Sequence, residues 1–312
     1  MTVASAPGKA ILFGEHAVVY GRPAIAVPVW EVSARAEVFD DPGAAPGSLL
    51  VEAPAIDLAG ELAALDPAHP LPRIILDTLH ALGVDQPPPM RLRVTSTIPI
   101  ASGLGSGAAV SVAVARALSQ HLGHPFEPSK ESALAFAVER IHHGTPSGVD
   151  NTVVAFGLPV YFRGGDPPVP FHVGAPVHLV IGDTGVASAT SVAVGGVRER
   201  WREYPAAYER RFDAIGAIVD EARRYIEAGR IADLGPLMDR NHCLLQEIGV
   251  SSPALDALVH AAIEAGAWGA KLSGAGMGGM MLALAPEAHV EAVHAALARA
   301  GAARTITTQV GE

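Results

Sequence analysis

Three glycine-rich stretches, far apart in the chain, hold the residues whose types and spacing could do chemistry. They cover residues 6–16, 99–109 and 271–279. In the second stretch glycines precede a run of small residues, so backbone N–H groups at a helix start could bind a polyphosphate. It is not a Walker A loop, because no Gly-Lys-Ser or Gly-Lys-Thr follows. Taken alone, a plain tight turn before a buried, alanine-rich helix explains this stretch equally well.

The distribution of charge restricts where an anion could bind. The formal net charge is −10, which disfavours a nucleic-acid partner and repels anions overall. An anionic substrate would therefore need a local positive field. Lysine occurs only at Lys9, Lys130 and Lys271, and the first and third stand inside glycine-rich stretches. Composition bias with two accidental placements is the alternative.

In this order and spacing, the three stretches resemble the signature motifs of the GHMP small-molecule kinases. They read APGKAILFGEH, PIASGLGSGAA and KLSGAGMGG, and the resemblance spans nearly the whole chain. The longer string LFGEHAVVYG, residues 12–21, is similar to the mevalonate kinase branch of that family. The resemblance implies a fold of two α+β domains with the active site in the cleft between them, and ATP and Mg²⁺ as cofactors.

The resemblance also implies which residues bind the nucleotide. The expected ATP-binding residues are Pro99, Gly103, Leu104, Gly105, Ser106, Gly107 and Ala108 of the second motif, with Gly274 and Gly276 of the third. In the family the second motif usually ends Ser-Ser-Ala, and its second serine is a magnesium ligand. Here that position is Gly107. Ser106 or a water could take its place. A hairpin or strand-entry loop is the other role open to the third motif, and we expect it to have both.

The segment IHHGTPSGVDN, residues 141–151, resembles the family segment around the catalytic aspartate. Its Pro-Ser-Gly run predicts a sharp turn that places Asp150 at a loop end, where it could accept a proton from the attacking hydroxyl. An Asx turn is the alternative. By resemblance, Glu139 is a magnesium ligand, and a hard oxygen ligand suits that ion. A solvated glutamate on a helix is the other interpretation.

Within the first motif, Lys9 is expected to be catalytic, since a lysine beside Asp150 would keep the aspartate ionised and neutralise charge on the moving phosphoryl group. We assign Glu15 and His16 to substrate binding. Thr190 matches a family threonine near the active site, although an N-cap for the following helix is equally consistent with it. Cys243 is interpreted as a packing residue, because it has no identifiable activating partner.

The elements that must position these residues mix strands and helices without strict alternation, which favours α+β layering. Expected strands cover residues 24–29, 32–38, 91–96, 158–162, 177–181, 280–285 and 305–310, and expected helices cover 70–82, 104–122, 130–142, 208–228, 231–248, 253–265 and 287–300. We place the domain boundary after a Gly/Pro-rich break, giving an N-terminal ATP-binding domain over 1–172 and a C-terminal domain over 173–312. The arginines at 198–202, 210 and 211 are expected to mark solvated helix faces.

Neither a membrane-spanning stretch nor a signal peptide is expected, because no apolar run reaches about 18 residues and no basic segment precedes an apolar one at the N-terminus. The single cysteine fits a cytoplasmic protein. The oligomeric state is not determined by the sequence, and a homodimer stays open.

The activity that the resemblance implies is ATP-dependent phosphorylation of the 5-hydroxyl of mevalonate. Two other enzymes stay open: another GHMP kinase, acting on phosphomevalonate or a sugar, and mevalonate diphosphate decarboxylase, a lyase of the same fold. A non-catalytic relative is the third alternative. The joint presence of Lys9, Glu139 and Asp150 argues against it.

Overall fold

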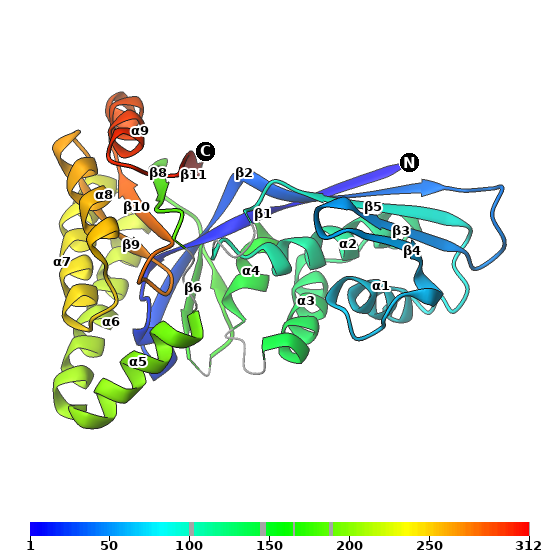
Figure 1. The fold of residues 1–312 in the computed structure, drawn as a ribbon, viewed down its shortest axis with the longest axis horizontal. Coiled ribbons are helices and arrows are strands. Elements are labelled where there is room, and N and C mark those ends of the chain that lie inside the picture. The colour runs from blue at the N-terminus through cyan, green and yellow to red at the C-terminus, as the bar shows by residue number, and fades with distance from the viewer. Residues whose placement is uncertain (100–102, 144–147, 165, 187–189, 312) are drawn as a thin grey trace. The chain divides into compact units, whose positions relative to one another are not determined.

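The computed structural model describes residues 1–99, 103–143, 148–164, 166–186 and 190–311 (Figure 1). By internal contacts the chain forms two compact units, and neither is contiguous in sequence. Unit 1 comprises residues 1–8, 32–100 and 104–157, and unit 2 comprises residues 9–31, 101–103 and 158–312. The change from one unit to the other therefore occurs within the first strands as well as at residue 157. The family-domain boundary after residue 172 stays a prediction.

Unit 1 packs helices beside a sheet. In the described residues its strands have the order β4-β3-β5-β2, with β3 and β5 parallel and the other neighbours antiparallel. The strands are β1 (Thr2–Phe13), which pairs with β2, then β2 (Pro23–Asp40), β3 (Leu49–Ala53), β4 (Leu58–Glu61) and β5 (Met90–Ser96). The helices are α1 (Pro70–Ala81), α2 (Ser106–His121), α3 (Pro128–His143) and α4 (Val149–Phe156). Neighbouring helices in this series contact one another, and α2 contacts β5 (Figure 1).

Local sequence patterns explain these elements. On α1 the buried residues Leu71, Ile74, Ile75 and Leu79 recur at helical spacing, and a proline occupies the first turn, where it is tolerated. On β5 buried and exposed residues alternate from Met90 to Val94, as one buried face of a sheet requires. Both elements were predicted within one residue of their observed bounds.

Unit 2 contains an antiparallel sheet in the order β11-β8-β10-β9. Its strands are β8 (Val177–Asp183), β9 (Gly269–Ser273), β10 (Met280–Leu284) and β11 (Arg304–Val310), and β6 (Val160–Arg163) pairs with both β7 (Val169–Pro170) and the first residues of β2. Its helices are α5 (Thr190–Glu203), α6 (Pro205–Glu227), α7 (Leu234–Glu247), α8 (Pro253–Glu264) and α9 (Val290–Arg299). Helices α7, α8 and α9 pack on the sheet, and their core includes Leu245, Leu255, Leu272, Met281 and Leu297.

Several elements differ from those predicted. The strands expected at 24–29 and 32–38 are one continuous strand, β2. Strands β1, β3, β4, β7 and β9 and helix α4 were not predicted, because the glycine-rich motifs and short segments there lack a clear periodicity. The prediction for Cys243 was wrong. Its side chain is exposed on α7, while Asn241, His242 and Leu245 occupy the buried face of that helix.

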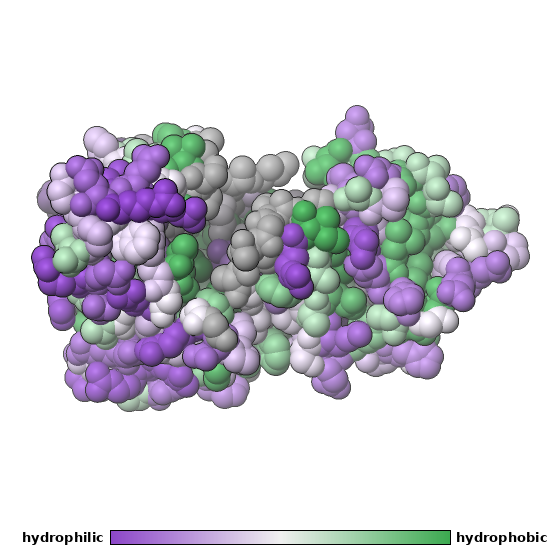
Figure 2. Space-filling view, turned by 90° about the horizontal axis from the view of Figure 1, so that it is seen from below, coloured by the Kyte–Doolittle hydropathy of each residue, from purple (hydrophilic) through white to green (hydrophobic). Residues whose placement is uncertain are grey.

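The surface of unit 2 in Figure 2 is mostly hydrophilic. Arg198, Arg202 and Arg210 of this unit are exposed, as predicted. Arg200 is not simply solvated, since it donates to Ile248 O at 2.9 Å and to the Tyr208 hydroxyl at 3.1 Å. In the described part of the chain, no helix has the length and apolar character needed to cross a membrane.

Candidate active site

The second glycine-rich motif of unit 1 leads directly into helix α2. Gly105 is the N-cap, with φ 73°, a left-handed conformation that suits glycine. The first helical hydrogen bond runs from Ala109 N–H to Gly105 O at 3.0 Å, so the N–H groups of residues 106–108 precede the intrahelical ladder. The first turn contains no acidic residue. This helix start, with its positive dipole end, has the donors and the charge that a phosphate requires. Residues 100–102 lie outside the described residues.

Gly107, the position that departs from the family pattern, has free space around it. Gly107 is exposed, and a Cβ built on it would meet no atom within 4 Å. A serine side chain would therefore fit there without displacing a neighbour. The hydroxyl of Ser106, half-buried in the same turn, is the side-chain oxygen that this turn offers a metal ion.

Asp150 lies in the first turn of α4, which begins directly after Gly148 with φ 83°. The predicted loop end is thus the first turn of a short helix, because Val149 to Phe156 provides enough apolar contact to extend it. A carboxylate suits this end of a helix. The neighbouring Asn151 does not form a local turn. It is buried and donates to Ser132 O at 3.1 Å and to the Ser132 hydroxyl at 2.7 Å. Residues 144–147 lie outside the described residues.

Glu139 is half-buried and lies one turn before the end of α3, a helix that packs on α4. Among the described residues there is no group of three or more His, Cys, Asp or Glu side chains that could hold a metal ion. Magnesium does not require such a group, because it usually keeps several waters and binds one or two carboxylates together with substrate phosphates. Glu139 and the Ser106 hydroxyl, both hard oxygen donors, fit that pattern.

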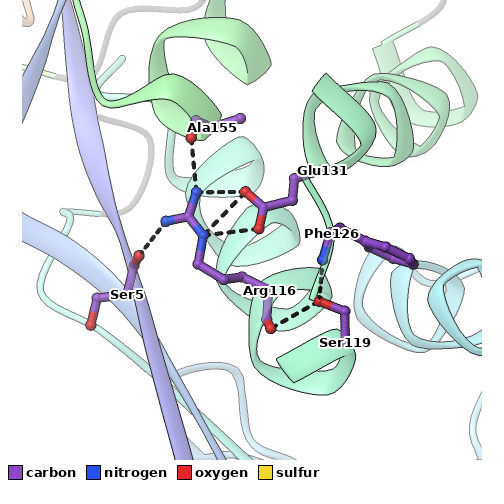
Figure 3. A network of polar contacts seen from close by, with 6 residues as sticks. All are labelled: Ser5, Arg116, Ser119, Phe126, Glu131 and Ala155. Atoms are coloured by element: carbon purple, nitrogen blue, oxygen red, sulfur yellow. Dashed lines mark hydrogen bonds and ion pairs between the residues drawn. The ribbon is translucent and has the colours of Figure 1, made fainter. Parts of the chain in front are cut away.

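A half-buried arginine connects the elements that carry these residues (Figure 3). Arg116 of α2 contacts both oxygens of Glu131 on α3, with distances from 2.5 to 3.1 Å. It also donates to Ala155 O of α4 at 2.8 Å and to Ser5 O of β1 at 2.9 Å. Three helices therefore share one guanidinium anchor: α2, which begins at Ser106, α3, which carries Glu139, and α4, which has Asp150 in its first turn. Sequence reasoning missed this network, since Arg116 only interrupted an apolar run.

Unit 2 carries the third motif and the first motif from Lys9 onward. Lys9 lies on β1 within a buried run, and 7% of its surface is exposed. Thr190 is the first residue of α5, and its side chain lies outside what the structure describes, as do Ser188 and Ala189.

Glu15 forms a buried ion pair that was not predicted. The Lys271 ammonium donates to Glu15 Oε1 and to Leu272 O, the latter at 2.6 Å, and Asn241 Nδ2 lies 3.5 Å from Glu15 Oε2. The side chains of Lys271 and Glu15 are 0% and 1% exposed. Burial raises the pKa of the Glu15 carboxyl and lowers the pKa of the Lys271 ammonium, while their mutual attraction opposes both shifts. The signal in the sequence was the scarcity of lysine together with the placement of Lys271 in a motif.

His16 is also buried, and its Nε2 lies 2.9 Å from Ala275 O. A carbonyl oxygen only accepts, so Nε2 carries the proton in this contact. Burial lowers the pKa of the imidazole, an effect that the bond to Ala275 partly opposes, so His16 is neutral near pH 7. The first motif thus contacts the third through both Glu15 and His16.

The third motif connects β9 to β10, which pair as an antiparallel hairpin. The predicted hairpin is confirmed, and its role in binding nucleotide stays a prediction. Gly276 has φ 76°, and a Cβ there would lie 2.0 Å from Val250 O, so no other residue fits. Met277 N–H donates to the same carbonyl at 2.7 Å, and the Ser273 hydroxyl donates to Ile11 O at 2.9 Å. These contacts define the path of the loop.

Comparison with known proteins agrees with this geometry. A family model described as the GHMP kinases N terminal domain matches residues 72–157, and a second, GHMP kinases C terminal, matches residues 213–303. The chain belongs to the GHMP kinase family. It is 37% identical to a mevalonate kinase of Pyrococcus horikoshii over 91% of this chain and 88% of that protein. The two-domain α+β fold expected from the motifs is thereby confirmed.

Two solved structures are similar over nearly the full length. Mevalonate kinase from L. major, in complex with R-mevalonate, has a TM-score of 0.83 and 30% identity, covering 100% of this GHMP kinase and 96% of that chain. The Methanococcus jannaschii mevalonate kinase has a TM-score of 0.85 at 23% identity, covering 99% and 98% of the two chains, and this likeness shows the fold alone.

Proposed function

We propose that this GHMP kinase is a mevalonate kinase, which transfers the terminal phosphoryl group of ATP to the 5-hydroxyl of mevalonate and releases 5-phosphomevalonate and ADP. The observation that supports it most strongly is similarity to mevalonate kinases along the whole chain, including a relative that is 37% identical over 91% of it. The string LFGEHAVVYG, which pointed to the same branch, lies outside both matched family segments and so adds to them independently.

The proposed mechanism assigns each described group a task. The N–H groups at the start of α2 bind the phosphates of ATP, with the positive end of the helix dipole toward them. The Asp150 carboxylate accepts the proton of the 5-hydroxyl as the oxygen of that hydroxyl bonds to the terminal phosphorus and the bond from phosphorus to the ADP oxygen breaks. The Lys9 ammonium neutralises negative charge on the oxygens around that phosphorus.

Glu139 and Ser106 would hold magnesium together with the phosphates, and the ion would neutralise phosphate charge. We further propose that His16 and Thr190 bind mevalonate and that Gly274 and Gly276 approach the nucleotide. The cytoplasmic location and a homodimer stay predictions.

A coupled assay for ADP release tests the function. The purified chain is given MgATP with mevalonate, phosphomevalonate, mevalonate diphosphate, homoserine or galactose in turn. We expect ADP release only when mevalonate is the added substrate, and no release of carbon dioxide or inorganic phosphate. Faster turnover of phosphomevalonate or a sugar would make the chain a different GHMP kinase, and carbon dioxide from the diphosphate would make it the decarboxylase.

A further inference from the structure

The backbone at His16 is strained. Its φ of 59° and ψ of −49° lie in a region that residues with a side chain rarely adopt. Ala17 N–H donates to Glu15 O at 2.6 Å, which closes a three-residue turn centred on His16. This is the γ-turn with positive φ, the rarer and more strained of the two γ-turn forms. Such strain persists only where surrounding contacts over-determine the conformation, and it is concentrated at functional sites.

Contacts before the turn and within it supply that constraint. Before it, Gly14 has φ 99°, and a Cβ there would lie 2.5 Å from Ala24 Cα, so the chain is held closely against β2. At the first position of the turn, the Glu15 carboxylate is held by Lys271 and Asn241. At its centre, the His16 ring is held by Ala275 O. Two side chains and one backbone carbonyl, all more than 200 residues away in sequence, therefore act on one three-residue turn.

The contacts and the burial of the Glu15 carboxylate indicate the role of this residue. Both of its oxygens have partners within the protein, and the side chain is 1% exposed. The carboxylate could accept further hydrogen bonds, but a side chain this buried offers a ligand almost no surface to contact. Glu15 is thus placed to act on the turn rather than on a ligand.

We propose that Glu15, Lys271 and Asn241 form a clamp that holds His16 in its strained turn, so that all three are positioning residues and His16, rather than Glu15, meets mevalonate. The inference rests on the proposed function only for its kinetic readout. It replaces the direct contact with substrate that we expected of Glu15.

The test uses Glu15→Gln, Lys271→Met and the double variant Glu15→Gln/Lys271→Met in the full chain. Each single variant leaves one charge buried without its partner, so we expect a lower urea midpoint and a lower kcat. The double variant contains neither charge. We expect its urea midpoint to rise above that of Lys271→Met, while kcat stays at least about tenfold below wild type, because nothing anchors the turn. Wild-type kcat in the double variant would show that the pair serves stability alone and would overturn the proposal.

A second readout does not depend on activity. In protein labelled with ¹⁵N-histidine, the His16 ring signal is identified by its loss in His16→Asn. We expect the wild-type signal to show the proton on Nε2, and the double variant to shift or broaden it. A signal unchanged in the double variant would overturn the clamp even if the enzyme acts on another substrate, and a shifted signal would support it in that case too.

The matched control is a surface ion pair of the same unit. Arg211 Nε lies 2.8 Å from Glu247 Oε2, and the two side chains are 30% and 53% exposed. The double variant Arg211→Met/Glu247→Gln removes the same two charge types, and we expect wild-type kcat and an unchanged His16 signal. An equal effect in this control would show that loss of any ion pair of this unit produces the changes, and it would overturn the proposal.

Discussion

Replacing Arg116 by methionine should destabilise unit 1 more than most substitutions would. The guanidinium contacts the carboxylate of Glu131 and the carbonyls of Ser5 and Ala155, all within 3.1 Å. Methionine would fill part of the volume but would donate no hydrogen bond. The Glu131 side chain, which is 3% exposed, would keep its charge and lose its ionic partner.

The magnitude follows from that uncompensated charge. Removing one partner of a buried ion pair costs about 3–5 kcal/mol, and the Glu131 carboxylate that would remain is the buried member of this pair. In a domain of ordinary size, where 1 kcal/mol shifts the melting temperature by about 2–4 °C, this corresponds to a loss of roughly 6–20 °C. Adding Glu131→Gln to Arg116→Met removes the unpaired carboxylate charge. The double variant should therefore be more stable than Arg116→Met alone.

Urea unfolding of the two variants measures the effect. The control is Arg73→Met, which breaks an exposed pair on α1 in which Arg73 Nε lies 2.8 Å from Asp77. Exposed pairs contribute about 0–1 kcal/mol, so this variant should unfold close to wild type. A loss below about 1 kcal/mol for Arg116→Met would refute the reasoning, as would a double variant less stable than the single one.

Three further outcomes are expected. Asp150→Asn should reduce turnover by roughly 10²–10⁴-fold while MgATP still binds, as measured by steady-state kinetics and nucleotide titration; a variant that keeps more than about a tenth of the rate would remove Asp150 from the chemistry. Gly107→Ser should change turnover little, since its site is open, whereas Glu139→Ala should raise the magnesium concentration needed for half-maximal rate; an unaltered requirement would leave Ser106 as the better ligand. The pKa of His16 is lowered by burial, so the folded state resists protonation and stability should fall as the pH drops below about 6.5 toward the folded pKa. His16→Asn should flatten that part of the stability curve.

Local patterns in the sequence were sufficient to predict the helices and strands that bury one face. Helix α1 and strand β5 were predicted almost to the residue, because their apolar residues recur at the helical and the strand period. The glycine-rich motifs were found from composition, but the strand β9 inside the third motif was not. Its residues are buried throughout apart from Ser273, so neither period appears in the five-residue segment.

The parts of the site that could not be predicted depend on contacts between distant residues. Glu15 and Lys271 are 256 positions apart, so no local spacing in the sequence predicts their ion pair. The turn at His16 is equally hidden, because histidine carries no preference for positive φ strong enough to indicate it. Arg116 and Glu131 are only 15 positions apart, yet their pairing depends on how α2 packs on α3. Motifs thus indicated which residues matter, and the fold shows which of them act on each other.

The positions of the three lysines in this chain also depend on their surroundings in the folded structure. Lysine is almost never fully buried unless it is paired, and of the three lysines here Lys9 is 7% exposed and Lys271 is 0% exposed, whereas Lys130 is at the surface. Arginine serves most of the surface ion pairs instead. An ammonium is a compact point charge, while a guanidinium is a broad planar fork. At the fully buried position 271, the side chain contacts one carboxylate oxygen and one carbonyl oxygen. An ammonium fits these two acceptors, whereas a guanidinium with five N–H donors would leave some of its donors without a hydrogen bond. At position 271 the fold therefore requires a small buried cation, which explains why this site has lysine in a chain that mostly uses arginine.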